Sequence, residues 1–499
     1  MSLADILPED IWRTIASHLS AQKRRQMISL NRVFFNVALE ERYYEVQWIT
    51  LDWRTLETLV RLQEPMVARK VRRLHIRAWF IEHLLKRDAL LSPGTIVKYK
   101  VATWTSFLCN FLNPPAKHIS PNLLGDALST QNAGRYYRSL KNTLEAQNPS
   151  IPSSHVIIRS MVNAITGMAG VTEYHFEWRD LPLNNDTRMF LTLSVTVFRI
   201  NLHSLVLSAQ ISKFEHLLKN TSFPYLEELN LHFDYAPCIA SQDGHESINK
   251  EEDILLHAVI PFINSHKTYL HSLKISSAAS ADLSSFFLAL GTFPSLRRYA
   301  VQLNFDQAHL SVPTSLTQTL TAHASTLLHV QLKPYGFDVT SPPLPLQRTM
   351  SELWKPVLNN PRSLTNLESL TMPSCNQRDM LILLRRNSNT LSHLCLLGRF
   401  LGYQDVVDVV DVFSHRPYAL KHLHVEIDVL GKQVIGLLAR RLPGLKTLIL
   451  VFNRLMDVDS SDLVCSSAPE LLKKYVHFWL PYIVRSSVRY ERRLQVCIL

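Results

Sequence analysis

A short apolar pattern that recurs along most of the chain constrains the fold more than any other feature. Apolar residues occupy positions 1, 4 and 6 of eleven segments, which begin at residues 71, 171, 202, 226, 270, 296, 327, 367, 391, 420 and 445. From residue 171 onward these segments follow one another at intervals of 24 to 44 residues. Internal periods of about 20 to 50 residues are typical of repeat architectures, in which each unit buries its apolar face against its neighbours.

Helical patterns fill several gaps between these segments. Apolar residues recur at helical spacing in residues 211–219, 282–290, 377–386, 405–413 and 432–441. A short strand followed by an amphipathic helix, repeated, is the unit of a β/α solenoid. Because side chains alternate along a strand, positions 4 and 6 should point into the core and positions 3, 5 and 7 should point away from it.

Residues 171–452 therefore resemble leucine-rich-repeat proteins in a degenerate form, since the asparagine of their L-x-x-L-x-L-x-x-N pattern is not consistently present. The resemblance implies an α/β fold, an irregular solenoid with helices outside. Three copies share an approach to position 1: Phe223-Pro224, Phe293-Pro294 and Leu442-Pro443. The alternative is a doubly wound α/β domain, but no G-x-G-x-x-G and no G-x-x-x-x-G-K-[ST] follows a predicted strand.

The first forty-five residues contain the pattern of three short helices. The first is expected over residues 7–19, where Pro8 suits the first turn. Ser20 can cap the second helix, and Asn31 or Arg32 opens the third. Helices this short cannot bury all their apolar side chains among themselves, so part of that surface should meet a partner chain or the rest of the protein.

These helices resemble the F-box, through Leu7-Pro8-Glu9-Asp10-Ile11, then Ile15, Leu19, Met27, Leu30-Asn31-Arg32 and Phe34-Phe35. F-box proteins dock through this motif on the Skp adaptor of cullin–RING ubiquitin ligases. The resemblance implies an adaptor-binding site that consists of Leu7, Pro8, Ile11, Ile15, Leu19, Leu30 and Phe34. Within this site, Leu30 and Phe34 would order the third helix. Where the family often has an acid–leucine pair, this chain has the basic run 21–25, AQKRR.

We expect four parts: an F-box-like helical motif over 1–45, a linking region with the first strand and a helical insertion over 46–170, the leucine-rich-repeat-like solenoid over 171–452 and a C-terminal helical cap over 453–499. Helices are expected near 95–112, 134–147 and 155–168. Loops are expected over 241–253, which is polar and acidic, and 340–348, which is proline-rich. An amphipathic helix is expected over roughly 469–495.

Composition narrows the class of protein. The chain of 499 residues is 46% hydrophobic and carries 53 basic against 42 acidic residues, a net charge of +11. This excess makes nucleic-acid binding a minor alternative. None of the six cysteines forms a C-x-x-C, no secretory signal pattern opens the sequence and no apolar run reaches membrane-spanning length. We therefore expect a cytoplasmic or nuclear protein that does not span a membrane.

Histidine is enriched at the positions expected to face away from the core. It occupies 7 of 33 such positions, whereas its overall frequency of 21 in 499 would give about 1.4. We take a substrate-binding surface to include His175, His232, Arg298, His329, His393, His422 and His424. His422 and His424 with Glu426 could instead bind a metal, although a partner surface is favoured. Histidine would make partner binding depend on pH between about 5 and 8.

The sequence contains no recognisable catalytic constellation. No H-E-x-x-H, no G-x-S-x-G and no Asp/Glu/His cluster at metal spacing occurs. We therefore expect no enzyme, no cofactor and no metal. The favoured interpretation is a substrate-recognition adaptor, in which the F-box docks a Skp adaptor, and through it a cullin–RING ligase, while the solenoid holds an unknown protein substrate. The alternatives are a scaffold or inhibitor solenoid without a ligase and, less favoured, a nucleic-acid-binding solenoid.

Overall fold

The computed structural model describes residues 7–91, 153–178, 185–218, 221–234, 250–279, 281–335, 344–374, 376–456, 463–464 and 493–498. The chain divides into two compact units, Met1–Ser204 and Leu205–Leu499. The expected helices over 95–112 and 134–147 lie outside the described residues. Among the described residues, no helix is both long enough and apolar enough to cross a membrane.

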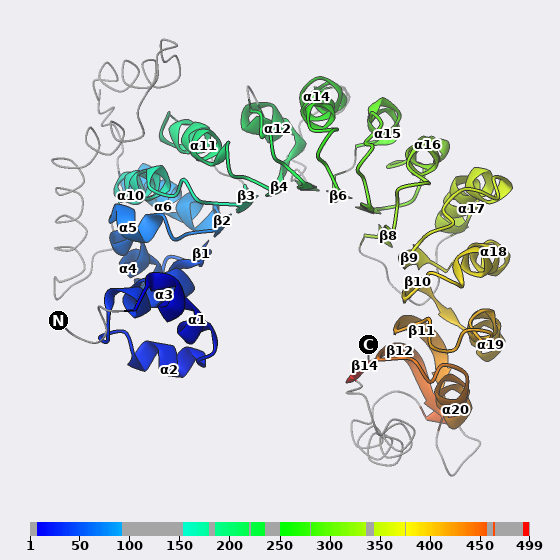
Figure 1. Cartoon of the computed structure of the whole chain (residues 1–499). Coiled ribbons are helices and arrows are strands. Elements are labelled where there is room, and N and C mark those ends of the chain that lie inside the picture. The colour runs from blue at the N-terminus through cyan, green and yellow to red at the C-terminus, as the bar shows by residue number, and fades with distance from the viewer. Residues whose placement is uncertain are drawn as a thin grey trace. The chain divides into compact units, whose positions relative to one another are not determined.

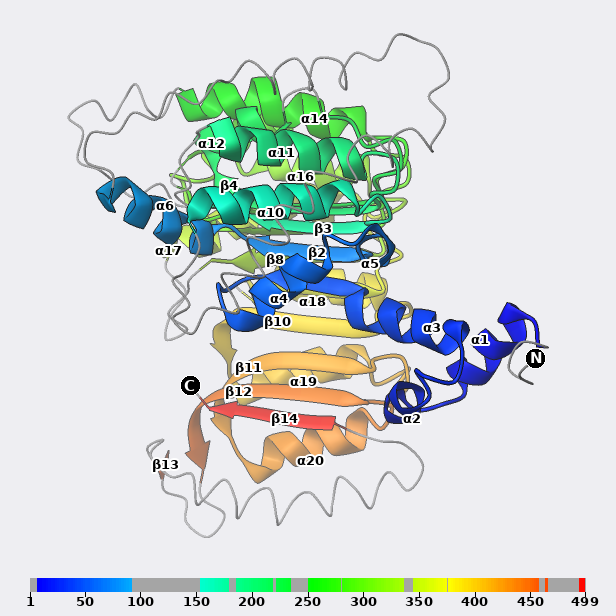
Figure 2. The same ribbon diagram turned by 90° about the vertical axis from the view of Figure 1, so that its left-hand side faces the viewer.

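The first unit contains three parallel strands in chain order, with Glu45, Arg73 and Glu173 in register. Helices α10 and α11 cover one face of β2 and β3 (Figures 1 and 2). Its elements are α1 (Glu9–Ser17), α2 (Ala21–Gln26), α3 (Arg32–Tyr43), β1 (Glu45–Trp48), α4 (Trp53–Arg61), α5 (Pro65–Ala68), β2 (Arg73–Arg77), α6 (Trp79–Leu91), α10 (Ser154–Thr166), β3 (Glu173–Glu177) and α11 (Asn185–Phe198).

The second unit repeats a strand and a helix. Its strands are β4 (Ser204–Gln210), β5 (Glu228–Asp234), β6 (Ser272–Ser277), β7 (Arg298–Leu303), β8 (His329–Pro334), β9 (Ser369–Pro373), β10 (His393–Leu401), β11 (His422–Leu430), β12 (Thr447–Met456), β13 (Leu463–Val464) and β14 (Arg493–Ile498). Its helices are α12 (Ile211–Leu218), η2 (Leu255–Val259), α14 (Ile260–Ser265), α15 (Ser284–Ala289), α16 (Thr314–Ala322), α17 (Leu344–Asn359), α18 (Gln377–Asn387), α19 (Tyr403–Val412) and α20 (Lys432–Arg441).

Neighbouring strands of the second unit lie in chain order up to β12. The pairs from β5 to β12 are all parallel. β13 is antiparallel to β12, and β14 is parallel to it. Within this unit the helices lie on one face of the strands (Figure 1). The expectation of an α/β fold is therefore confirmed.

All eleven apolar segments are strands, and each strand begins at position 3 of its segment. Positions 1, 4 and 6 are buried in every one, apart from Leu448 of β12, which is half-buried. The sequence prediction missed β1, the first strand of the structure, although Tyr43, Val46 and Trp48 fit the same pattern. All three of these side chains are buried.

One backbone hydrogen-bond arrangement recurs where the strands begin. The carbonyl at position 2 of a segment accepts from the N–H groups at positions 2 and 3 of the next segment. For example, the Glu368 carbonyl accepts from Ser392 at 2.9 Å and from His393 at 3.0 Å. The arrangement occurs at the carbonyls of Tyr44, Arg72, Thr172, Glu227, His271, Arg297, Leu328, Glu368, Ser392 and Lys421. Backbone atoms alone therefore set the register from one repeat to the next.

At the ends of three helices, a buried polar side chain forms a hydrogen bond with the backbone just before the preceding strand. The Nδ1 of His323 lies 2.7 Å from the Thr319 carbonyl, and its Nε2 accepts from the Phe293 N–H at 2.8 Å. His266 makes the same pair of contacts with Phe262 and Phe223 at 2.7 and 3.1 Å. Asn387 uses its amide similarly, accepting from the Leu367 N–H at 3.0 Å.

The three residues that make these contacts, His266, His323 and Asn387, each stand four residues before position 1 of the next segment. Because different side chains can make the contact, the repeats do not need an asparagine at one regular position. The first two also explain the Phe-Pro approaches in the sequence, because Phe223 and Phe293 supply the N–H groups. Since Nε2 must accept a hydrogen bond, both rings must be neutral. Burial lowers the pKa of His266 and of His323 accordingly.

The expected helices over 155–168, 211–219, 282–290, 377–386, 405–413 and 432–441 correspond to α10, α12, α15, α18, α19 and α20. Helices α4, α5, α6, α11, η2, α14, α16 and α17 were not predicted. The expected loop over 340–348 is wrong from Leu344 onward, where α17 begins. Its Pro345 stands in the first turn, where an N–H has no intrahelical partner in any case.

Two further expectations differ from the structure. The loop expected over 241–253 is wrong at residues 250–253, which are helical and lead into η2; residues 241–249 lie outside the described residues. The helix expected over 469–495 lies mostly outside them too, but its last three residues belong to strand β14. That strand continues the parallel pairing beside β12, with Arg493 in register with Thr447. The four-part division with boundaries at 45, 170 and 452 stays a prediction.

Replacing His323 by alanine should destabilise the fold, because the buried Phe293 N–H loses its acceptor. We expect the free energy of unfolding in urea at pH 7.5 to fall by about 1–3 kcal/mol. A histidine titrates near pH 6.5 in an unfolded chain, and its folded pKa here is lower. The stabilisation by His323 is therefore complete above about pH 6.5, where the unfolded chain titrates, and is lost as the pH falls below that value. The difference in unfolding free energy between wild type and variant should then shrink towards pH 5.

The matched control is His415→Ala, at an exposed histidine of the same unit. Its free energy of unfolding should stay within about 0.5 kcal/mol of wild type at both pH values. Equal losses in the two variants would contradict the structural role of His323.

Candidate functional site

The N-terminal helices are fastened to the first unit by ion pairs through two acids of α3. Glu40 lies 3.0 Å from Arg13 of α1 and 2.7 Å from Lys70, which follows α5. Glu41 lies 3.0 Å from Arg24 of α2. Arg24 also donates to the Ala16 carbonyl at 3.2 Å and to the Leu19 carbonyl, which caps the end of α1. This gives the basic residue at the centre of the motif a structural role.

Sequence signals at the helix starts are confirmed for two of the three helices. The Ser20 hydroxyl accepts from the Lys23 N–H at 3.4 Å, and the Asn31 carbonyl oxygen of the side chain accepts from the Phe34 N–H at 2.9 Å. Pro8 stands at the N-cap of α1, one residue before the first turn in which it was expected. The three helices therefore form a defined unit of local structure.

This helical region leaves an apolar surface exposed. Ile11 and Ile15 lie four residues apart on α1 and are 43% and 36% exposed, and Leu7, two residues before the helix begins, is 43% exposed. Leu30, between α2 and α3, is 46% exposed. Six of the seventeen large apolar side chains that the described residues leave exposed lie between Leu7 and Phe35: Leu7, Ile11, Ile15, Met27, Leu30 and Phe35. We call these six the N-terminal apolar surface.

The remaining residues of the expected adaptor-binding set support this surface. Phe34 is only 1% exposed and packs edge-on against Trp12 of α1, with ring centroids 5.7 Å apart. It therefore joins α3 to α1 from within. Leu19 is half-buried, and Pro8 is exposed at the start of α1.

The strands of the second unit carry positions 3, 5 and 7 on one face, which we call the open face. This face brings four of the expected substrate-binding histidines close together. His393 and His422 are in register on β10 and β11, and their rings stack with centroids 4.1 Å apart. In the next row, the Nδ1 of His424 lies 3.3 Å from the Sγ of Cys395. His329 occupies the row of His393 two strands away, with Ser369 of β9 between them.

Cations dominate the surroundings of these histidines. Burial lowers the pKa of His329, and Arg298 lowers it further; burial and Lys333 do the same for His424. Burial and the neighbouring His393 lower the pKa of His422. Lys274 of β6 and Lys333 of β8 also repel each other, so that burial and Lys333 lower the pKa of Lys274. These cations favour additional negative charge close to the four histidines.

The two other expected residues of this face already have acidic partners, although one of them, Arg298 of β7, is in register with His329. The Nη1 of Arg298 lies 3.4 Å from Glu228, and the Nε2 of His232 lies 3.0 Å from Asp234. His175 belongs to the first unit, where it stacks on His75. The structure thus does not bring all seven residues into one site.

The metal alternative at His422, His424 and Glu426 is not supported by the geometry. The Glu426 carboxylate is buried and accepts from the Gly398 N–H at 2.6 Å. Gly398 has a φ of +77° at a bulge in β10, a conformation that favours glycine. Within the described residues, the only group of three potential ligands close enough to share a metal is His75, His175 and Glu177.

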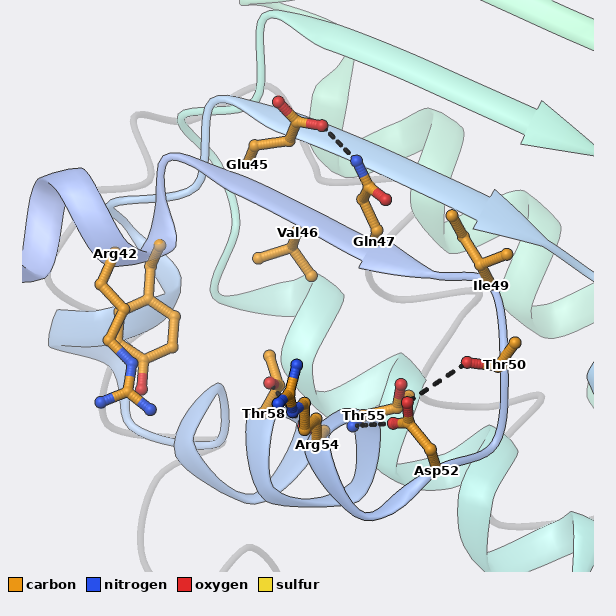
Figure 3. Close-up of a pocket in the computed structure, with 11 residues that line it drawn as sticks. Arg42, Glu45, Val46, Gln47, Ile49, Thr50, Asp52, Arg54, Thr55 and Thr58 are labelled. Carbon is orange, nitrogen blue, oxygen red and sulfur yellow. Dashed lines mark hydrogen bonds between the residues drawn. The ribbon is translucent and has the colours of Figure 1, made fainter.

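An open pocket of about 390 Å³ lies in the first unit between β1 and α4 (Figure 3). Asp52 in this pocket is already engaged, since it accepts from the Thr55 N–H at 2.8 Å and from the Thr50 hydroxyl at 3.4 Å. The remaining polar lining includes Arg42, Glu45 and Arg54.

Neither the protein-family models nor the curated proteins contain a significant match to this chain. A function must therefore be argued from the residues and their geometry.

The Cys395 thiol should react slowly with alkylating agents, although it lies on the open face of a strand. Burial raises its pKa to about 11 from 9.0, and the thiolate is the reactive form. In a variant that retains Cys395 as its only cysteine, alkylation by iodoacetamide at pH 8 should be about 100-fold slower in the folded than in the urea-unfolded protein. Equal rates in the two states would contradict the burial of this thiol.

Proposed function

We propose that the chain is a substrate-recognition adaptor of a Skp–cullin–F-box ubiquitin ligase. The observation that carries the proposal is the N-terminal apolar surface, which concentrates exposed apolar side chains on helices fastened by ion pairs. Exposed apolar side chains that gather in one short region are typical of interaction sites. Leu7, Ile11, Ile15 and Leu30 belong both to this surface and to the positions at which the sequence resembles the F-box.

In this proposal the residues divide into two kinds. Exposed side chains, with Leu19 beside them, contact the Skp adaptor: Leu7, Pro8, Ile11, Ile15 and Leu30. The buried Phe34 acts through α3, because its contact with Trp12 fixes the angle between α1 and α3. The adaptor would cover apolar area that gains about 25 cal/mol for each Å² removed from water.

The same proposal takes the strand and helix repeats as an irregular leucine-rich-repeat-like solenoid. What supports it is the parallel order of the strands and the recurring double hydrogen bond at position 2. The solenoid would hold a protein substrate, and other subunits would supply the ubiquitin-transfer chemistry in the cytoplasm or nucleus. This chain would then act through proximity alone, without being an enzyme.

The substrate site in this proposal is the open face of the second unit, around His329, His393, His422 and His424. Burial and neighbouring cations lower the pKa values of these histidines, which favours their neutral forms. An acidic segment of a substrate would pair with Lys274 and Lys333 and would favour protonation of the histidines. The charged groups that face the four histidines are Arg298, Lys333, Lys421, Lys446 and Glu368.

Changing one exposed residue of α1 tests the adaptor role. Ile11→Glu places a charge in the apolar surface, so we expect affinity for a purified Skp adaptor to fall at least about 30-fold, an effect of 2 kcal/mol or more typical of a central contact. Isothermal titration calorimetry measures this directly.

The control is Ile200→Glu, because Ile200 is also in the first unit and is 69% exposed. It should bind the adaptor as wild type does, and both variants should keep the wild-type thermal unfolding temperature. Equal binding by the Ile11 variant and wild type, or no binding by wild type, would contradict the adaptor role and favour a scaffold that assembles no ligase.

Binding of an acidic peptide should strengthen as the pH falls. With a fluorescein-labelled decaglutamate peptide as probe, we expect the Kd to decrease about 3- to 10-fold between pH 7.5 and 5.5, because binding is coupled to uptake of protons by the histidines. The change should be smaller in the His422→Ala/His424→Ala variant. A control at the exposed His415, His415→Ala, should keep the full dependence.

A pH-independent Kd in wild type would contradict the role of these histidines. A single-stranded oligonucleotide that binds more tightly than the peptide, with a steep dependence on salt, would favour the nucleic-acid alternative instead.

A further inference from the structure

Two histidines and a glutamate converge on the open face of β2 and β3 in the first unit. The Nε2 of His75 lies 3.3 Å from the Oε1 of Glu177, and the Nε2 of His175 lies 3.4 Å from the same oxygen. One ligand atom from each of the three residues lies within 4.8 Å of the other two. The neutral imidazole nitrogens and the carboxylate oxygen are the donors that zinc prefers in proteins.

The sheet brings these residues together although their strands are about 100 positions apart in the sequence. His75 and His175 both occupy position 5 and are in register, and Glu177 is two residues further along β3. Their side chains therefore share one face. The two rings stack with centroids 3.9 Å apart and planes within 5° of parallel.

We propose that His75, His175 and Glu177 form a binding site for a zinc-like divalent transition-metal ion. The site is separate from the N-terminal apolar surface and from the open face of the second unit. Its three ligands would leave at least one coordination position for water or for a donor from a bound molecule.

The protonation of two ligands suits this role. Burial, and to a smaller extent His75, lowers the pKa of His175 to about 4, so this ring is neutral at pH 7. Although burial opposes ionisation of Glu177, hydrogen bonds from His75 and Arg77 lower the pKa of its carboxyl to about 2.

Two local changes must accompany binding. The Nε of Arg77 lies 3.1 Å from the same Glu177 oxygen, so this contact has to loosen; the Arg77 side chain is 42% exposed and can turn into solvent. The two imidazole rings also have to rotate out of their parallel stack, because a metal binds along the lone pair in the plane of each ring. Arg77 is thus a competitor of the metal for Glu177.

The competition gives a test with effects of opposite sign. The full-length protein is stripped with a chelator, and its affinity for Zn²⁺ is measured by competition with a chromophoric chelator. We expect one Zn²⁺ per chain in wild type. His175→Ala and the isosteric Glu177→Gln should each weaken binding at least about 10-fold, the loss that even an outer-sphere partner causes. Arg77→Gln should strengthen it.

The control is His203→Ala, at an exposed histidine of the same unit, which should bind zinc as wild type does. Circular dichroism of each variant identifies any loss of folding. Co²⁺ added to wild type should give the visible absorption of a low-symmetry nitrogen and oxygen site, and His175→Ala should lack it. Three results would each overturn the proposal. They are wild-type affinity for zinc in both His175→Ala and Glu177→Gln, weaker zinc binding in Arg77→Gln, and no zinc bound by wild type.

Discussion

At ten of the described repeats the backbone carbonyl at position 2 accepts two hydrogen bonds from the next repeat, and the rest of the architecture depends on that contact. It fixes the start of each strand, as where the Arg297 carbonyl accepts from Leu328 and His329 at 2.9 Å each. Because strand side chains alternate, a fixed start also fixes which residues are buried. A shift of one residue would expose the apolar positions 4 and 6.

This dependence on backbone atoms explains why the repeats tolerate so much sequence variation. No single polar side chain is required at a given turn, and the buried ties differ, from His266 and His323 to Asn387. Most residues at positions 3, 5 and 7 lie outside the core, apart from Ser276, Pro373 and Glu426, which are buried at position 7. They are therefore free to carry the histidines and cations of the open faces, which the fixed register brings into rows.

The apolar pattern predicted eleven strands because positions 1, 4 and 6 are buried for one physical reason in every repeat. It missed β1, whose first buried position, Tyr43, is also the last residue of helix α3. Helices α16 and α17 were missed for different reasons. The helix α16 buries Ser315, Thr317 and Thr319, whose hydroxyls bond to backbone carbonyls, and α17 opens in a proline-rich stretch.

The candidate sites were less predictable than the strands. The shortness of the N-terminal helices predicted that some of their apolar side chains stay uncovered, whereas the burial of Phe34 required its contact with Trp12 to be seen. The convergence of His75 and His175 on Glu177 depends on the pairing of β2 with β3. Nothing in the local sequence indicates that pairing, because it joins segments about 100 residues apart.

Hydrogen–deuterium exchange of the full-length chain, with and without a purified Skp adaptor, tests the central claim most directly. The account predicts slower exchange in the adaptor complex over α1 and the segment from Met27 to Phe35, with the strands of the second unit unchanged. Unchanged exchange over residues 7–35, or slowing confined to the second unit, would contradict it.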